Sequence, residues 1–382
     1  MRPHCADSPQ HQSQGIRKSI SRLVRGVDHS LLWIDRSPSN CHRGTHTGAR
    51  SLSGGSAMPR CATYTFQDPT LYASAIRPAN VGIFPTARGR FHATLTQVDF
   101  DRLWTQFANE SLPRVAHSTL PNRYNIAFLA DSNQPGAKYC GMEISPNAAV
   151  LGAPGSSRHI RSYAACRWAT MSLTPDDLSV AGAALTGREL RLGSAIRVLH
   201  PEPAHMAHLL RLHTATRQLA ESAPEILKRS EVSNALEQEL VHAMVTCLAD
   251  DTGADTSAAW RQHSAIMKRF EDYLAANCDL PLYLPHICSA TKASERTLRN
   301  CCQEHLGMGP LKYLWLRRMH IARRALIRQD PARVTVTQIA TQYGFWHLGR
   351  FAVSYLRLFG ESPSVTLHRP DDPKVSPKII SL

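Results

Sequence analysis

The chain has 382 residues, enough for two or three domains, and hydrophobic residues make up 43% of it. No stretch approaches the roughly 20 consecutive apolar residues of a membrane span, and no apolar run of a secretory signal follows the first residues, so we expect a cytoplasmic protein. Ten cysteines are scattered along the chain, a pattern that predicts neither a disulfide framework nor a paired-cysteine zinc site.

The net charge of +14 is localised. Residues 1–57 carry +5 and residues 260–370 carry +9, whereas residues 58–259 are neutral. Clustered Lys and Arg neutralise phosphates, so this distribution is typical of a regulatory domain joined to a nucleic-acid-binding domain. A solvated basic face is the other interpretation that charge alone leaves open.

The region before residue 200 divides at Met58. Residues 1–57 are rich in Ser, Gly, Arg and His without a regular period, which predicts a disordered leader, and Met58 is a candidate for the true translation start. Residues 58–202 carry short apolar runs between turn residues, which favours a small barrel or sandwich. The expected strands include 124–129, 138–144, 148–151, 160–163 and 167–173.

A helical hairpin is expected over residues 203–257, where the apolar spacing becomes helical and Pro224 stands where a second helix would begin. One face of its first helix carries Met206, Leu209, Leu210 and His213. Such a hairpin either packs on the β-rich domain or pairs with a second subunit, and both alternatives stay open.

An internal repeat of about 52 residues follows. The matched positions are Ile287-Cys288 with Ile339-Ala340, Leu298 with Phe351, Gly307 with Gly360, and Pro310 with Pro363. Each copy predicts two short helices separated by a turn, with Ser294 as the N-cap in the first copy and Gly344 in the turn of the second. A small residue between the helices lets them cross closely, which is typical of a helix-turn-helix unit.

One helix without Pro or Gly is predicted between the copies, over residues 311–327. Its expected packed face comprises Leu311, Leu314, Trp315, Ile321, Ala322, Ala325 and Leu326. Its basic residues are expected elsewhere around the helix: Lys312, Arg317, Arg323, Arg324 and Arg328. A rigid helix would fix the distance between two recognition helices, as successive major grooves about 34 Å apart require.

From about Ile266 to Arg369 the chain resembles the AraC/XylS family of bacterial transcription regulators. The resemblance rests on Arg318-Met319-x-x-Ala322-x-x-Ala325-Leu326 and on GFWHLGRFAVSYLRLFGESPS from Gly344 to Ser364. It implies an α+β chain in which a cupin-like barrel and a helical hairpin precede an all-α tandem helix-turn-helix domain. The expected divisions are a leader at 1–57, a sensor domain at 58–202, a hairpin and linker at 203–257, a DNA-binding domain at 258–370 and a tail at 371–382.

Carried over by position, the resemblance places three base-reading side chains on the first recognition helix, Arg296, Arg299 and Asn300. Arg pairs with guanine and Asn with adenine, so their chemistry suits this role. The second helix departs from the commoner family pattern, because Val353 stands where an Arg is usual. Its expected contacts are His347, Leu348, Gly349, Arg350 and Val353, with His347 and Arg350 on phosphates.

The resemblance implies a transcription regulator, more often an activator, that acts as a homodimer on double-stranded DNA with RNA polymerase and responds to a small-molecule effector. No effector-binding residue is assigned, although Arg77, Arg88, Arg90, Arg158 and Arg161 would suit an anion if they faced the domain interior. No catalytic residue, metal or cofactor is predicted.

Two enzyme classes are the alternatives. A DNA-repair methyltransferase would carry a Pro-Cys-His-Arg string, and here Asn40 stands before Cys41-His42-Arg43 in place of Pro. A cupin metalloenzyme would need clustered ligands, and the middle domain offers only the scattered His92, His117 and His159. Cys301, Cys302 and His305 make a weak zinc candidate, because the repeat places their face in the helical core.

Overall fold

The computed structural model describes residues 59–369 except 78, 121, 188, 191, 251–256 and 278–281. These residues belong to one unit of the chain, which begins at Ala57. The predicted leader, the Cys41-His42-Arg43 string and the predicted tail therefore lie outside the described residues.

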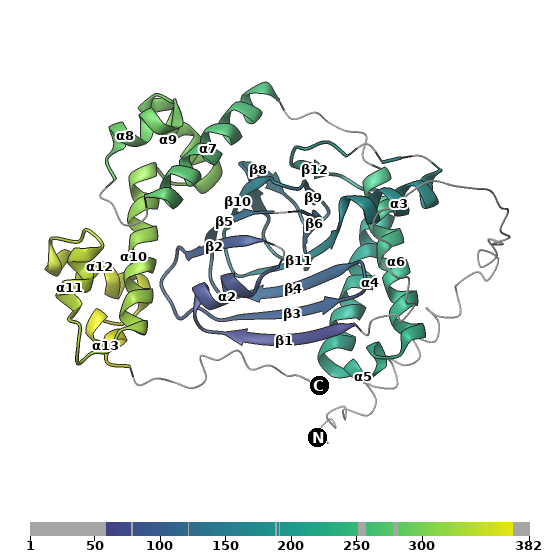
Figure 1. Ribbon diagram of the computed structural model, residues 1–382, viewed down its shortest axis with the longest axis horizontal. Helices are drawn as coiled ribbons and strands as arrows, with labels where there is room; N and C mark the ends of the chain where they lie inside the picture. The colour runs from purple at the N-terminus through teal and green to yellow at the C-terminus, as the bar shows by residue number, and fades with distance from the viewer. Residues whose placement is uncertain are drawn as a thin grey trace, which may run out of the picture. The chain divides into compact units, whose positions relative to one another are not determined.

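The N-terminal half is built from two antiparallel sheets (Figure 1). The larger, in spatial order, contains β1 (Arg60–Phe66), β3 (Ala93–Asp99), β4 (Trp104–Glu110), β11 (Cys166–Leu173), β6 (Tyr124–Leu129), β9 (Ala149–Gly152) and β12 (Arg197–Leu199). The smaller contains β2 (Asn80–Pro85), β5 (Arg114–Thr119), β10 (Ser157–Ser162), β7 (Ala137–Tyr139) and β8 (Met142–Ile144). A short helix, α2 (Pro69–Ala75), packs on β2.

The predicted β-rich domain is confirmed, but its closure into a barrel is wrong. Among the described strands, none pairs across the two sheets. The sequence did not show this, because the alternation of apolar residues specifies which face of a strand is buried but not which strand it pairs with. The strand predicted at 124–129 is β6, whereas the run at 138–144 forms the hairpin β7-β8. Its turn is made by Cys140 and Gly141, both with positive φ (50° and 84°).

Four helices follow or cover the larger sheet: α3 (Pro175–Thr186), α4 (Pro203–Ser222), α5 (Pro224–Leu227) and α6 (Ser230–Ala249). The helix α4 packs on β3 and on α6, and Figure 1 shows both long helices beside the larger sheet. A Glu237 oxygen of α6 accepts hydrogen bonds at 2.9 Å from the backbone N–H groups of Arg102 and Leu103. Of the two alternatives for the hairpin, the structure shows packing on the β-rich domain.

His213 of α4 is buried against the sheet, with its ring 3.8 Å and 5.2 Å from the ring centroids of Phe107 and Phe128. Its Nε2 lies 3.3 Å from the Thr170 carbonyl, and its Nδ1 has no partner. Burial lowers the pKa of His213 to about 3, so the ring is neutral in the folded chain.

This histidine predicts a loss of stability in acid. The unfolded state takes up a proton below about pH 6.5, whereas folded His213 does not until about pH 3, so the free energy of unfolding falls as the pH drops between these values. At pH 5 the expected loss is about 2 kcal/mol. His213→Leu should reduce the difference between urea unfolding at pH 7 and pH 5 by this amount, whereas His242→Ala on the exposed face of α6 should not. Equal pH dependence in the wild type and His213→Leu would contradict the prediction.

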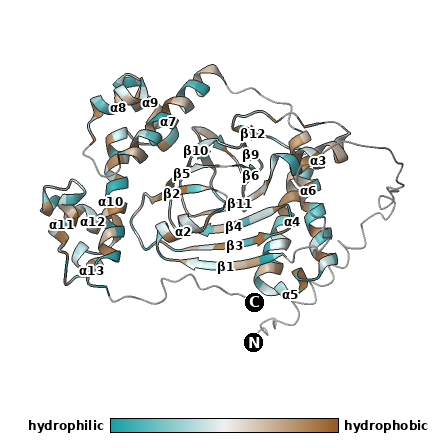
Figure 2. Ribbon diagram, viewed as in Figure 1, coloured by the Kyte–Doolittle hydropathy of each residue, from teal (hydrophilic) through white to brown (hydrophobic). Residues whose placement is uncertain are grey.

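The C-terminal half is helical and contains the predicted repeat. Its elements are α7 (Ala258–Ala276), α8 (Leu284–Thr291), α9 (Glu295–Leu306), α10 (Pro310–Arg328), α11 (Val336–Gln342), α12 (Leu348–Phe359) and α13 (Pro363–Leu367). Ser294 caps α9 as predicted by accepting from the Thr297 N–H, and Gly307 and Gly360 end α9 and α12 with φ near 70° and 78°. Figure 2 shows hydrophilic and hydrophobic residues mixed along these helices. Within the described part of the chain, no helix is long and apolar enough to cross a membrane.

The helix between the repeats was predicted over 311–327, and α10 confirms it, but part of its predicted packed face is wrong. Leu311 is 52% exposed, whereas Tyr313, Met319 and His320 are buried. The reason is that α10 packs on the β-rich domain as well as on its own helices: His320 Nε2 lies 3.1 Å from the Pro85 carbonyl of β2.

Candidate DNA-binding surface and effector cavity

The first recognition helix, α9, has one buried face and one exposed face. Its buried residues, Leu298, Cys301, Cys302, His305 and Leu306, fix the helix in the core. Arg296, Arg299 and Asn300 all lie on the exposed side, as base contacts require. The structure thus places the three predicted side chains together, and their role in reading bases stays a prediction.

The exposed residues of α9 differ in their surroundings. Arg299 forms an ion pair with Glu295 one turn earlier (Nη2–Oε1 2.5 Å), whereas Arg296 has no ion pair within the described chain. Gln303, which the sequence analysis missed, is also exposed and follows Arg296 and Asn300 at the spacing of one helix face. That spacing was the available signal, because Gln can pair with adenine.

The second recognition helix, α12, exposes a mainly apolar face. The predicted His347, Leu348, Gly349, Arg350 and Val353 are all exposed. Trp346, another residue that the prediction missed, is 74% exposed beside them. Phe351 and Phe359 are buried in the helical core.

Two basic residues of α10, Arg317 and Arg323, form ion pairs with residues outside this helix. Arg323 is 16% exposed and contacts Glu361 at 2.8 Å, which ties α10 to the second unit. Arg317 is 19% exposed and forms an ion pair with Glu271 of α7, which ties α10 to the first. These contacts make α10 a fixed connection between the two recognition helices.

The β-rich domain contains an internal cavity of about 70 Å³ between its sheets. Its wall is mostly aliphatic and aromatic, formed by residues such as Ile83, Phe128, Ile144, Val150, Ile160 and Trp168. Its polar residues include Arg114, Asn125, Tyr139 and Arg158. A mostly apolar cavity with a few converging polar groups is the usual form of a small-molecule site.

Three of these polar groups are incompletely satisfied. The Tyr139 hydroxyl and the Arg114 Nη1 are buried without a hydrogen-bond partner among the described residues. Arg158 is 5% exposed and donates to Ser118 (2.7 Å) and Asn125 (3.0 Å), with no carboxylate partner among the residues that the structure describes. A buried cation without an anion is costly, so the cavity favours an anionic occupant.

Arg114 is partly neutralised, because its Nε lies 2.5 Å from Glu110 Oε2. Tyr72 and Trp168 each donate to the other Glu110 oxygen at 2.8 Å, so both oxygens of that carboxylate have partners. Burial raises the pKa of Tyr139 to about 12, so its hydroxyl stays a neutral donor.

The five arginines considered for an anionic effector separate into two groups. Arg77 and Arg158 line the cavity, although Arg77 is paired with Asp99 at 2.7 Å. Arg88 and Arg90 are exposed, and Arg161 stacks on the Tyr163 ring outside the cavity. Arg114 and Tyr139 were missed, since no local pattern shows which side of a strand faces the interior.

The histidines and cysteines considered as metal ligands of an enzyme do not line the cavity. Cys301, Cys302 and His305 are buried in the helical core, as the repeat predicted. His92 is exposed, and His117 and His159 do not line the cavity.

Comparison with known proteins supports the helix-turn-helix assignment. The helix-turn-helix domain family matches residues 287–369. The probable thc operon regulatory protein of Rhodococcus erythropolis is 41% identical over 102 residues, which are 27% of this chain and 31% of that protein. The XylDLEGF operon transcriptional activator of Pseudomonas putida is 35% identical over 103 residues, 27% of this chain and 32% of that protein.

A crystal structure of a probable AraC family transcriptional regulator from Rhodopseudomonas palustris is 33% identical, covering 27% of this chain and 95% of that chain with a TM-score of 0.25. The chain thus spans about a third of the length of the first two relatives. All three are named as regulatory proteins. Over residues 287–369 the chain belongs to the helix-turn-helix domain family, and in this segment it is similar to transcription regulators of the AraC/XylS kind.

Proposed function

We propose that the chain is a sequence-specific transcription regulator whose DNA binding is controlled by a small anionic molecule in the cavity of its β-rich domain. The observation that carries the DNA-binding part is the pair of recognition helices with exposed faces, joined by the single helix α10. Arg296, Arg299 and Asn300 supply base-reading groups, and Arg350 supplies a phosphate contact.

The proposed division of labour follows the predicted boundaries. Residues 58–202, a cupin-like sensor, bind the effector, residues 203–257 support dimerisation, and residues 258–370 bind DNA. Activation, in contact with RNA polymerase in the cytoplasm, is proposed because the relative from Pseudomonas putida is named a transcriptional activator. A homodimer would place four helix-turn-helix units on one operator, which is tested by the size of the protein–DNA complex in analytical ultracentrifugation.

The effector is proposed to be a small carboxylate with an apolar body. Arg158 would supply the charge, and Arg114 Nη1 and the Tyr139 hydroxyl would donate to the carboxylate oxygens, because both are buried without partners. The apolar wall would cover the remainder of the molecule.

Thermal unfolding tests this proposal with a panel of small aliphatic and aromatic monocarboxylates and their matching primary amides. A carboxylate that binds only the folded state should raise the Tm in proportion to its occupancy, whereas its amide should not. The Tyr139→Phe variant should bind the carboxylate about tenfold or more weakly, since a hydrogen bond to a charged group contributes about 1.5 to 3 kcal/mol.

The same variant should fold normally without ligand, because the hydroxyl that it lacks forms no hydrogen bond of ordinary geometry with the described residues. Tyr163→Phe is the matched control, since Tyr163 is 42% exposed and bonds Glu143 outside the cavity. Equal binding of carboxylates and amides, or unchanged affinity in Tyr139→Phe, would overturn the proposed effector class and leave the DNA-binding assignment standing.

A further inference from the structure

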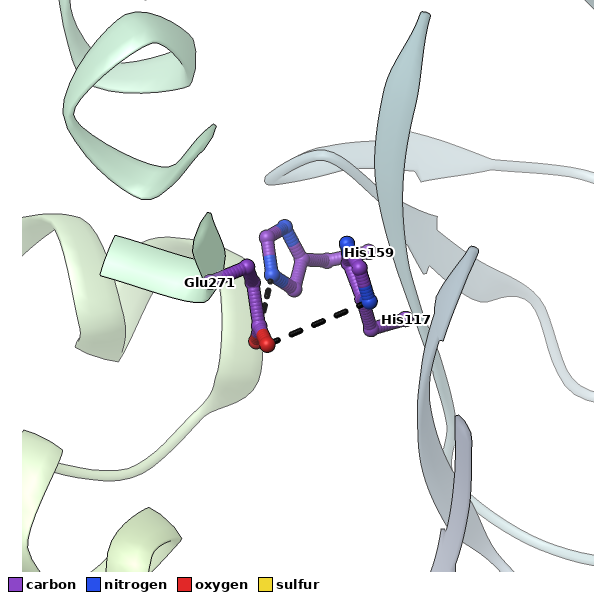
Figure 3. Close-up of side chains that lie close together, drawn as sticks. All are labelled: His117, His159 and Glu271. Carbon is purple, nitrogen blue, oxygen red and sulfur yellow. Dashed lines mark hydrogen bonds and ion pairs between the residues drawn. The ribbon is translucent and has the colours of Figure 1, made fainter. Parts of the chain in front are cut away.

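Three side chains from distant parts of the sequence meet outside both sites described above (Figure 3). His117 of β5 and His159 of β10 are directly paired in register, so their rings leave the smaller sheet on the same face. Glu271 of α7 faces them, with His159 Nε2 3.1 Å from Oε1 and His117 Nδ1 3.9 Å from Oε2. The three candidate ligand atoms all lie within 4.8 Å of one another.

These distances suit a shared cation. Two ligand atoms about 2.0 to 2.1 Å from a tetrahedral metal lie about 3.3 to 3.4 Å apart. The 3.1 Å between His159 Nε2 and Glu271 Oε1 is close to that value, and His117 Nδ1 lies 3.9 Å from the other oxygen, Oε2. Two imidazoles and one carboxylate form a ligand set that Zn²⁺ accepts with a fourth position left for water. His117 is 21% exposed, which provides a route from solvent.

The surrounding hydrogen bonds orient the ligands. His117 Nε2 lies 3.0 Å from Ser157 Oγ, which leaves its Nδ1 directed toward Glu271. Tyr313 donates to Glu271 Oε1 at 2.8 Å, and Arg317 donates to Oε2. Outer partners of this kind fix metal-binding imidazoles and carboxylates in place.

A second observation points to a missing partner at the same place. His305 of α9 is 1% exposed, its ring centroid lies 5.7 Å from that of His159, and neither of its ring nitrogens has a hydrogen-bond partner. A buried polar group in this state calls for water or an ion. A hydrated cation at His159 would supply it.

We propose that His117, His159 and Glu271 bind one divalent transition-metal ion, which joins strands β5 and β10 to helix α7 of the DNA-binding half. The ion takes the place of the proton between His159 Nε2 and Glu271 Oε1, and the neutral imidazole then carries its proton on Nδ1, while Arg317 keeps the other carboxylate oxygen. Because Arg317 repels the cation, the affinity is lower than that of a closed structural zinc site.

Co²⁺ titration of the intact, chelator-treated chain tests the site, because the visible spectrum of Co²⁺ reports its ligands. We expect one equivalent with the spectrum of nitrogen and oxygen ligands in tetrahedral geometry, and a metal-dependent rise in Tm. His117→Ala and Glu271→Gln should each weaken binding at least tenfold and abolish that rise. His242→Ala, which removes an exposed histidine from α6, should bind like the wild type.

His117→Ala keeps the test valid if the Glu271 variant fails to fold, since His117 is the exposed member of the cluster. Three results would overturn the proposal: no saturable binding in the wild type, unchanged affinity in His117→Ala, or a thiolate-to-cobalt band showing cysteine ligands. All three are measured without DNA or effector, so they do not depend on the proposed function.

Discussion

The affinity of the chain for duplex DNA is expected to fall by about 10³ to 10⁵ between about 50 and 200 mM monovalent salt. The reason is that residues 260–370 carry a charge of +9. With about 6 to 10 phosphate contacts, binding releases a corresponding number of counterions, and a plot of log affinity against log salt falls with a slope near 0.9 per contact. Fluorescence anisotropy with a labelled duplex over this salt range measures the slope directly.

Not every basic residue contributes to this slope. Arg317 and Arg323 are held in ion pairs with Glu271 and Glu361 within the protein, so their charges are already partly neutralised. Arg167→Ala is the control, since this exposed arginine of β11 lies outside the DNA-binding half. An affinity of the wild type that does not change with salt would contradict phosphate binding by residues 260–370. So would a salt slope that Arg167→Ala lowers as much as Arg350→Ala does.

The helical half could be predicted closely because its signals are local. Ser294 caps the helix that begins at the next residue, and Gly307 and Gly360 end helices through their own left-handed backbone conformation. Capping and stop residues that recur in both copies therefore mark the helices of each unit without knowledge of how the helices pack. The packed face of α10 was predicted wrongly because part of it is buried by residues distant in the sequence. Tyr313 and His320 are buried by the β-rich domain, a contact that no helical pattern contains.

The cavity and the Glu271 cluster could not be predicted, because they depend on which strands pair. Along β10, Arg158 and Ile160 line the cavity while His159 between them faces Glu271, so one strand serves two sites on its two faces. The sequence shows this alternation but not which face is which. That assignment comes from the pairing of His159 with His117, 42 positions earlier in the chain, and from contact with a helix 112 positions later.

The two recognition helices are expected to differ in what they read. On α9, Arg296, Arg299 and Asn300 can pair with base edges, whereas the matching face of α12 carries Leu348, Gly349 and Val353, which can touch a thymine methyl group but cannot form bidentate hydrogen bonds. Sequence specificity should therefore be concentrated in the half of each site that α9 contacts.

Arg296→Ala is expected to weaken specific binding by about 1 to 3 kcal/mol and to relax base preference within that half of the site. Arg299→Ala should also weaken specific binding, but by a smaller amount, because Arg299 must break its exposed ion pair with Glu295 before it can contact a base. Such a pair contributes at most about 1 kcal/mol. Arg350→Ala should instead weaken all sequences about equally and lower the salt slope by about one, because it removes a phosphate contact.

Binding of each variant to a randomised site library, with Arg167→Ala as the control for loss of one exposed arginine, separates these outcomes. Base preference lost in the Arg296 variant and kept in the Arg350 variant supports reading by α9 and anchoring by α12. The reverse result would assign base reading to α12. The exposed apolar face formed by Trp346, Leu348 and Val353 would then have to recognise DNA shape or thymine methyl groups, because none of these side chains can form bidentate hydrogen bonds with base edges.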